Sequence, residues 1–172
     1  TTEIYTLSLH DALPIWSHVR YLILPLLAIS ALAQTEPPRV VSGVCQVTVE
    51  NAQMNARPCD LNIGNEGYVP TGTTVRLRHV SAYCIAPIDR AIRMVRLDTQ
   101  LSNAYTDMHN TFVRLQRREI RSPGLHAEYQ GSQLMDAYAG PGLRIMATVT
   151  AELGSLTPRV SCEVRFQGTV VP

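Results

Sequence analysis

The chain has 172 residues and a formal net charge of +1 at pH 7, without the marked basic excess that is typical of nucleic-acid-binding proteins. All 15 basic residues are arginines, which we interpret as the codon bias of a GC-rich bacterium. No apolar run after Ala33 is long enough to span a membrane. Composition and charge therefore argue against a nucleic-acid partner and against a membrane span in the folded domain.

Residues 21–33, YLILPLLAISALA, have the pattern of a secretory signal peptide. Arg20 precedes an unbroken apolar centre, and the segment ends in the small-x-small sequence Ala31-Leu32-Ala33. A soluble core helix would carry a polar face, and a membrane-spanning helix would need about 20 apolar residues. The sequence therefore predicts a signal peptide over residues 16–33, cleavage after Ala33, and a secreted or periplasmic location.

Residues 1–15, TTEIYTLSLHDALPI, are not expected to belong to the folded domain. No methionine precedes Met54, and EIYTLSLHDALPI resembles the translation of sequencing-adaptor read-through. A short amphipathic lead-in is the alternative interpretation. In either case the segment is excluded from fold prediction, and a single domain is expected over residues 34–172.

Four cysteines, an even number, lie in the expected mature chain. In an exported protein this indicates two disulfides, because an oxidising compartment permits and preserves them. Three pairings are possible, and we prefer Cys45 with Cys59, which closes a short loop, and Cys84 with Cys162, which ties the middle of the domain to its last strand. A four-cysteine zinc site is the alternative, but no C-x-x-C spacing supports it.

The first half of the domain alternates apolar and polar residues, as strands do. The alternation begins at Val40, residues 51–60 have the composition of a loop, and a brief strand is expected over residues 61–63. The clearest strand is residues 73–87, in which Val75, Leu77 and His79 are expected on the core face. A strand with one wet face follows over residues 91–101.

The second half begins with a polar connection at residues 102–110. Further strands are predicted over residues 112–119, 125–129, 133–138, 143–153 and 159–171, with turns at 122–124, 131–132, 139–142 and 154–158. About eight short strands with little helical periodicity indicate an all-β, antiparallel β-sandwich stapled by two disulfides. A jelly-roll-like topology is preferred to an immunoglobulin-like one, because the only tryptophan, Trp16, precedes the domain.

No catalytic, cofactor-binding or metal-ligating residue is predicted, and no cofactor is expected. His79, His109 and His126 fall on different elements without a close histidine pair, and no G-x-S-x-G sequence is present. His79 is interpreted as a hydrogen-bonded core residue and His109 as solvated. Paired carboxylates for glycoside hydrolysis could be drawn from many positions, so their presence is uninformative.

Two groups of side chains are candidates for a binding surface. Arginines gather in two runs, which include Arg93 and Arg96 in one and Arg114 and Arg118 in the other. If the runs pair, they form a basic face suited to carboxylate or sulfate. The alternative is a solvated face with cross-strand ion pairs. Tyrosines at 105, 129 and 138 could line a sugar-binding surface or fill a half-buried sheet, and Tyr105 and Tyr129 are retained as candidates.

The mature chain resembles small exported bacterial β-sandwich proteins of unknown function, a general likeness that transfers no site. The sequence predicts a non-catalytic binding or adhesion-type module for a glycan or an envelope protein. A small envelope hydrolase or metal-dependent enzyme on the same fold is the alternative, and a structural subunit of an extracellular assembly is the weaker one. The oligomeric state is not predicted.

Overall fold

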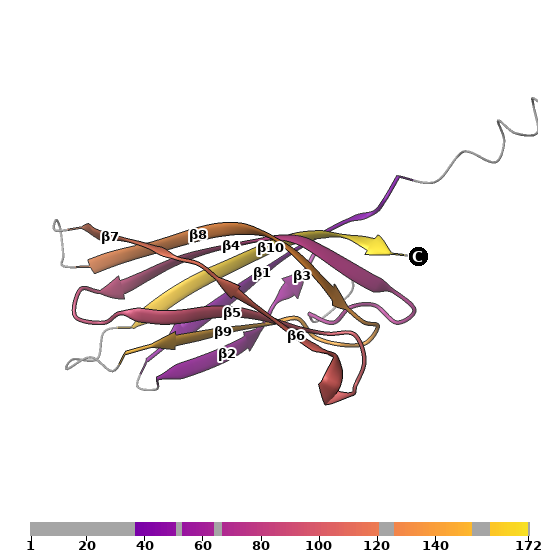
Figure 1. Ribbon diagram of the computed structural model, residues 1–172, viewed down its shortest axis with the longest axis horizontal. Coiled ribbons are helices and arrows are strands. Elements are labelled where there is room, and N and C mark those ends of the chain that lie inside the picture. The colour runs from indigo at the N-terminus through magenta and orange to yellow at the C-terminus, as the bar shows by residue number, and fades with distance from the viewer. Residues whose placement is uncertain (1–36, 51–52, 64–66, 121–125, 153–158, 172) are drawn as a thin grey trace, which may run out of the picture. The chain divides into compact units, whose positions relative to one another are not determined.

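The computed structural model describes residues 37–50, 53–63, 67–120, 126–152 and 159–171. These residues form two antiparallel β-sheets packed face to face (Figure 1), which confirms the predicted all-β antiparallel sandwich. The predicted signal peptide and residues 1–15 lie outside the described residues, as do the turn at 122–124 and the hairpin loop at 154–158.

The larger sheet has six strands in the order β3-β1-β10-β4-β8-β7. Their bounds are β1 Val40–Val49, β3 Asp60–Leu61, β4 Thr74–Pro87, β7 Gln116–Ile120, β8 His126–Ala139 and β10 Val160–Val171. The smaller sheet has the order β2-β9-β5-β6, with β2 Met54–Pro58, β5 Ile92–Gln100, β6 Met108–Val113 and β9 Met146–Ala151. A short 3-10 turn, Tyr105–Asp107, precedes β6.

The core lies between the two sheets and consists mainly of valine and alanine, with a few larger side chains. Alternate residues of each strand point into it, as the register of β1 shows: Val41, Cys45, Val47 and Val49 are fully buried. β-branched side chains suit this arrangement because they pack well on a pleated surface. Burying each of them contributes about 1.5–3 kcal/mol to the hydrophobic stabilisation.

Both predicted disulfides are present. Cys45 joins Cys59, and Cys84 joins Cys162, so no free cysteine remains. Cys84 and Cys162 are direct register partners on β4 and β10, whereas Cys59 follows β2 and is bonded to β1 of the other sheet. The Cys84–Cys162 bridge therefore cross-links two neighbouring strands of one sheet. The Cys45–Cys59 bridge links β1 to the segment that leaves the other sheet after β2. Two buried disulfides are consistent with an oxidising, extracytoplasmic location.

Two segments differ from the sequence prediction at the edges of the sheets. Residues 54–58, predicted as a loop, form β2, which pairs with β9. Its proline is tolerated because β2 is an edge strand and Pro58 is its last residue. The strand predicted over residues 112–119 is two strands in different sheets, because the chain leaves β6 and crosses at Arg114-Leu115 to reach β7.

Strand β8 is continuous where two short strands were predicted. Gly131 and Ser132, read as a turn, pair instead with Ala82 and Ser81 of β4. A register shift between Leu77 and His79 also changes the expected faces of β4. Val80, rather than His79, joins Leu77 in the core, so His79 lies on the outer face and is not a core histidine.

Candidate ligand-binding groove

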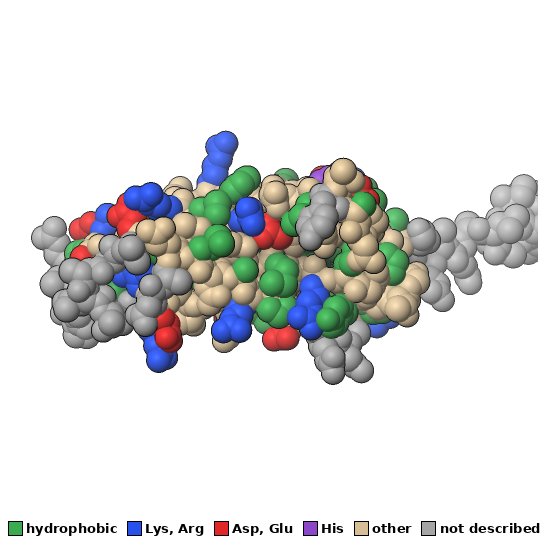
Figure 2. Space-filling model, turned by 90° about the horizontal axis from the view of Figure 1, so that it is seen from below, with side chains coloured by type: hydrophobic (Ala, Val, Ile, Leu, Met, Phe, Trp, Pro, Cys, Tyr) green, Lys and Arg blue, Asp and Glu red, His purple; other side chains and the backbone are tan. Residues whose placement is uncertain are grey.

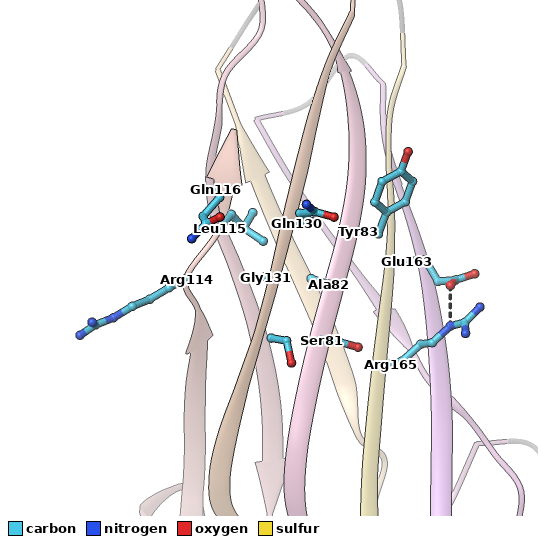
Figure 3. A pocket seen from close by; sticks show the side chains of 11 residues that line it. Ser81, Ala82, Tyr83, Arg114, Leu115, Gln116, Gln130, Gly131, Glu163 and Arg165 are labelled. Carbon is cyan, nitrogen blue, oxygen red and sulfur yellow. Dashed lines mark hydrogen bonds and ion pairs between the residues drawn. The ribbon is translucent and has the colours of Figure 1, made fainter. Parts of the chain in front are cut away.

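The outer face of the six-stranded sheet carries a groove of about 590 Å³. Its side chains come from four places in the fold (Figure 3): Ser81, Ala82 and Tyr83 of β4; Gln130, Gly131 and Ser132 of β8; Glu163 and Arg165 of β10; and Arg114, Leu115 and Gln116 at the β6–β7 crossing. Four segments distant in sequence thus meet in one concave surface, which is the usual form of a ligand site.

Small residues form the floor of the groove. Ser81 and Ser132 are register partners, and Gly131 lies beside them opposite Ala82. Any larger side chain at Gly131 is excluded, because a Cβ there would lie 2.0 Å from the carbonyl oxygen of Arg114. The glycine therefore lets the crossing segment approach the backbone of β8 closely, and Arg114, Leu115 and Gln116 at this crossing form one wall of the groove.

Gln133 fixes that wall in place. Its amide nitrogen donates to the carbonyl of Phe112 at 2.8 Å, and its amide oxygen accepts from the backbone N–H of Arg114 at 3.3 Å. Both bonds join β8 to the segment leaving β6, so the crossing is anchored on either side of residue 113. The wall is consequently a fixed part of the fold.

The charges in the groove are internally compensated. Arg165 Nε lies 2.6 Å from Glu163 Oε1, and Figure 3 shows this pair on the β10 side. Arg114 points away from the groove in the same view. Tyr83, which is 41% exposed, has its pKa raised mainly by a hydrogen bond with the Glu128 carboxylate. The uncharged side chain of Tyr83 therefore lies beside the Arg165–Glu163 ion pair, whose two charges cancel.

Three polar side chains in the groove are free to meet a ligand. Within the described residues, no side-chain hydrogen bond or ion pair engages Ser81, Gln116 or Gln130. Together they offer amide donors, amide acceptors and a hydroxyl group. The groove thus combines neutral hydrogen-bonding groups with one exposed aromatic ring.

Ser132 is engaged with His79. The serine hydroxyl lies 2.6 Å from His79 Nε2, so the histidine reaches the rim of the groove from the outer face. His126 lies at the start of β8 and His109 on β6 of the other sheet, so the three histidines are not gathered. The described residues include no group of three or more His, Cys, Asp or Glu side chains that could hold a metal ion.

The two arginine runs do not combine into one basic face. Arg93 and Arg96 belong to β5 of the smaller sheet, whereas Arg118 lies on β7 of the larger one, directly opposite Glu128. Arg93 and Arg96 are paired with Glu152 at 3.1 Å and Asp98 at 2.6 Å. Of the predicted arginines, only Arg114 borders the groove.

The predicted tyrosines are not part of the groove either. Tyr129 is 4% exposed and lies under Arg117, whose guanidinium carbon is 6.0 Å from the ring centre. The side chain of Tyr105 is outside the described side chains. The aromatic residue that the groove does present is Tyr83, which was assigned to β4 from sequence but not to a site. Period-two spacing places Tyr83 and Ser81 on one face, but the same spacing puts that face on the side of Leu77. Only the register shift between Leu77 and His79 brings them to the outer face.

The outer face of the smaller sheet differs from the groove in that it carries mainly apolar side chains. Figure 2, seen from below Figure 1, shows hydrophobic side chains gathered near the middle of this face around a basic and an acidic group. We call this surface the methionine face. By strand register and alternation it consists of Met54, Ala56 and Pro58 of β2; Met94 of β5; Met108 and Phe112 of β6; and Met146 of β9. At its centre, Asp98 accepts hydrogen bonds from Arg96 and from the Thr148 hydroxyl at 2.8 Å.

Comparisons with protein families, with curated proteins and with solved structures gave no match for this chain. Among the described residues, no helix is long and apolar enough to cross a membrane.

Proposed function

We propose that this protein is an exported, non-catalytic binding module whose groove on the six-stranded sheet takes a neutral glycan. The observation that carries the proposal is the set of unengaged neutral side chains, Ser81, Gln116 and Gln130, beside the exposed ring of Tyr83. A protein partner is the other occupant that the sequence predicts, but such interfaces usually have a more apolar centre than this groove offers.

The chemistry of a sugar matches these groups. Each sugar hydroxyl both donates and accepts hydrogen bonds, and a primary amide supplies both functions in one plane. The apolar face of a pyranose ring can lie on an aromatic ring, and Tyr83 provides such a surface while its hydroxyl is held by the Glu128 carboxylate. Because Glu163 neutralises Arg165, an uncharged ligand is favoured over an anionic one.

Export and the finer topology belong to the same proposal. The pattern of residues 16–33 supports a signal peptide, and the two disulfides support an oxidising destination. With the short edge strands β3 and β7 set aside, the sheets have the orders β1-β10-β4-β8 and β2-β9-β5-β6. Apart from β5 and β6, which pair in one sheet, successive strands of this set alternate between the sheets in the manner of two Greek keys, which supports the jelly-roll topology.

The direct test is a glycan array probed with residues 34–172, produced with oxidising export. We expect selective binding of neutral glycans, followed by a loss of about three- to tenfold in affinity for Gln130→Ala, the effect of one neutral hydrogen bond. Gln167→Ala is the matched control, because Gln167 is exposed on the same face but outside this groove. Equal losses for both variants, or selective binding unaffected by Gln130→Ala, would place the ligand elsewhere.

A hydrolase is the second candidate, and the Ser132–His79 pair is the observation that favours it. A serine within hydrogen-bond reach of a histidine is the first requirement for an activated nucleophile. No third side chain that orients His79 has a hydrogen bond to it within the described residues. Covalent labelling of Ser132 by a fluorophosphonate, abolished in His79→Ala, would establish this candidate in place of a non-catalytic module.

A structural subunit of an assembly is the weaker alternative, and the methionine face favours it. Met54 is 57% and Phe112 is 54% exposed, and contiguous apolar surface of this kind often marks a contact between proteins. Elution at the monomer mass at high protein concentration would count against this alternative. Concentration-dependent elution that Phe112→Ser abolishes would favour it.

A further inference from the structure

A row of planar side chains crosses five neighbouring strands, and four of its five members line the groove. Direct register partners connect its members in order: Gln46 of β1, Glu163 of β10, Tyr83 of β4, Gln130 of β8 and Gln116 of β7. We call this the planar row. All five members lie on the outer face and are at least partly exposed. The row therefore runs perpendicular to the strands and offers one planar side chain on each of them.

The spacing of the row is set by the sheet itself. Neighbouring strands lie about 4.8 Å apart, so a planar group recurs at that interval across the face. This interval is close to the length of one pyranose unit in an extended sugar chain. A chain lying across the strands would consequently meet a new planar group at every sugar.

The next row makes room for such a chain. It consists of Val44, Arg165, Ser81 and Ser132, again direct register partners. Its members on β4 and β8 are serines, whereas the planar row has Tyr83 and Gln130 on the same two strands. The face is thus lower at Ser81 and Ser132 than at Tyr83 and Gln130, and the groove lies over these two strands between Arg165 on β10 and the β6–β7 crossing.

Both ends of the planar row lie at sheet edges. β7 is the last strand on one side, and on the other side β3 pairs with β1 only at Gly43 and Val44, short of Gln46. Within the described residues, no further strand covers either end. A chain could therefore continue past the protein in both directions, so that the ligand need not be a sugar terminus.

We infer that the groove binds the interior of a linear, neutral polysaccharide that lies across the strands, with one sugar for each strand from β7 to β1. The inference rests on the proposed function, because it specifies which glycan the same groove takes. A groove bordered by a row of planar side chains suits a ribbon-like chain, and 1,4-β-linked glucose and N-acetylglucosamine chains have this form. Their equatorial hydroxyls point sideways toward the planar row, and their ring faces lie on Tyr83.

Isothermal titration of two oligosaccharide series tests the inference. The probes are 1,4-β-linked glucose and N-acetylglucosamine oligomers of increasing length from a single unit. In at least one series we expect the affinity to rise about threefold or more for each added unit, the contribution of one hydrogen bond. The rise should stop once the chain spans the planar row from Gln116 to Gln46. Equal affinity at every length would overturn the inference and leave a terminal-sugar site in its place.

Variants at the two ends of the row sharpen the test. Gln46→Ala and Gln116→Ala should weaken binding of the longest oligomers about three- to tenfold while leaving binding of the dimer unchanged. Gln167→Ala, outside both rows, should change neither. If the end variants affect short and long oligomers alike, or neither, the ligand does not lie along the row. Failure of both series to bind overturns the inference, while the glycan array decides separately whether the groove takes any other glycan.

Discussion

At the scale of single residues, Gly43 shows how tightly the sandwich is packed. Its backbone lies under the ring of Phe166, and a Cβ at this position would be 2.2 Å from the far edge of that ring. Phe166 is 1% exposed, so the ring cannot move into solvent to relieve the contact. The glycine in β1 is therefore required by its register partner in β10.

We accordingly predict that Gly43→Ala lowers the free energy of unfolding by about 1–3 kcal/mol, the usual cost of overpacking a core. Chemical denaturation measures the effect. In a Phe166→Leu background the added methyl group should cost less, because the far edge of the ring is gone. A cost of the same size in both backgrounds would show that the ring is not the cause.

The pair Arg76–Asp136 makes a prediction about pH. Arg76 donates from Nε and from Nη2 to the two oxygens of Asp136, each at 2.7 Å, and this holds the pKa of Asp136 below its ordinary value. A lowered folded-state pKa means that the pair stabilises the fold above the unfolded-state pKa. This stabilisation is lost as the pH falls through the lower, folded-state pKa.

Asp136→Asn should therefore destabilise the protein at pH 7 and do so less at about pH 2, because the stabilisation is lost as the pH falls toward and through the folded-state pKa of Asp136. The loss should be small and should shrink with added salt, because the pair is exposed. Denaturation midpoints at both pH values measure it, with Asp60→Asn as the control. A destabilisation of the same size at both pH values would mean that the carboxylate charge is not responsible.

At the scale of elements, the crossing from β6 to β7 determines the groove. Gly131→Ala would place a Cβ 2.0 Å from the carbonyl oxygen of Arg114, so the crossing must move away from β8. We expect a loss of about 1–3 kcal/mol in stability together with weaker glycan binding, because a wall of the groove shifts. Gln167→Ala, at an exposed position of the same face outside the groove, is the control and should leave the denaturation midpoint nearly unchanged. A stable Gly131→Ala protein that binds normally would mean that the crossing does not shape the site.

Some strands could be predicted from the sequence and others could not, for physical reasons. The long strands β1, β4, β5 and β10 were predicted because buried and exposed positions alternate over many residues, which fixes the strand and, except beyond the register shift of β4, its core face. The Cys45–Cys59 and Cys84–Cys162 pairing was also predicted. β2 was missed because an edge strand needs few apolar residues. The switch of sheet at Arg114-Leu115 was missed because a two-residue crossing leaves the alternation almost intact.

The groove was beyond the reach of sequence for a related physical reason. Ser81, Gln130 and Glu163 become neighbours only through the register of three strands, and a shift of one residue would turn any of them into the core. The predicted arginines and tyrosines were chosen for their chemical type. Tertiary structure instead buried Tyr129 and divided the arginines between the sheets. His79 reached the outer face only through the register shift in β4, which no local pattern indicates.

At the scale of the whole molecule, the two disulfides close loops of very different size. Cys84 and Cys162 are 78 residues apart in sequence, whereas Cys45 and Cys59 are 14 residues apart. Cross-linking a longer loop removes more entropy from the unfolded chain, by about 4.5 kcal/mol for the long loop and about 3 kcal/mol for the short one at 25 °C. Both bridges also fill buried space between the sheets, since all four cysteines are nearly or fully buried.

We therefore predict that the Cys84→Ala/Cys162→Ala variant is less stable than the Cys45→Ala/Cys59→Ala variant, by about 1–2 kcal/mol on the loop-entropy difference. Urea denaturation of the two double variants beside the oxidised wild type measures the difference. The long bridge joins β4 to β10, the two strands that carry Tyr83, Ser81, Glu163 and Arg165. Loss of this bridge should therefore also weaken glycan binding, whereas loss of the short bridge should spare it. The opposite order of stabilities would show that the Cys59 crossing, and not the closure of the long loop, governs the stability of the sandwich.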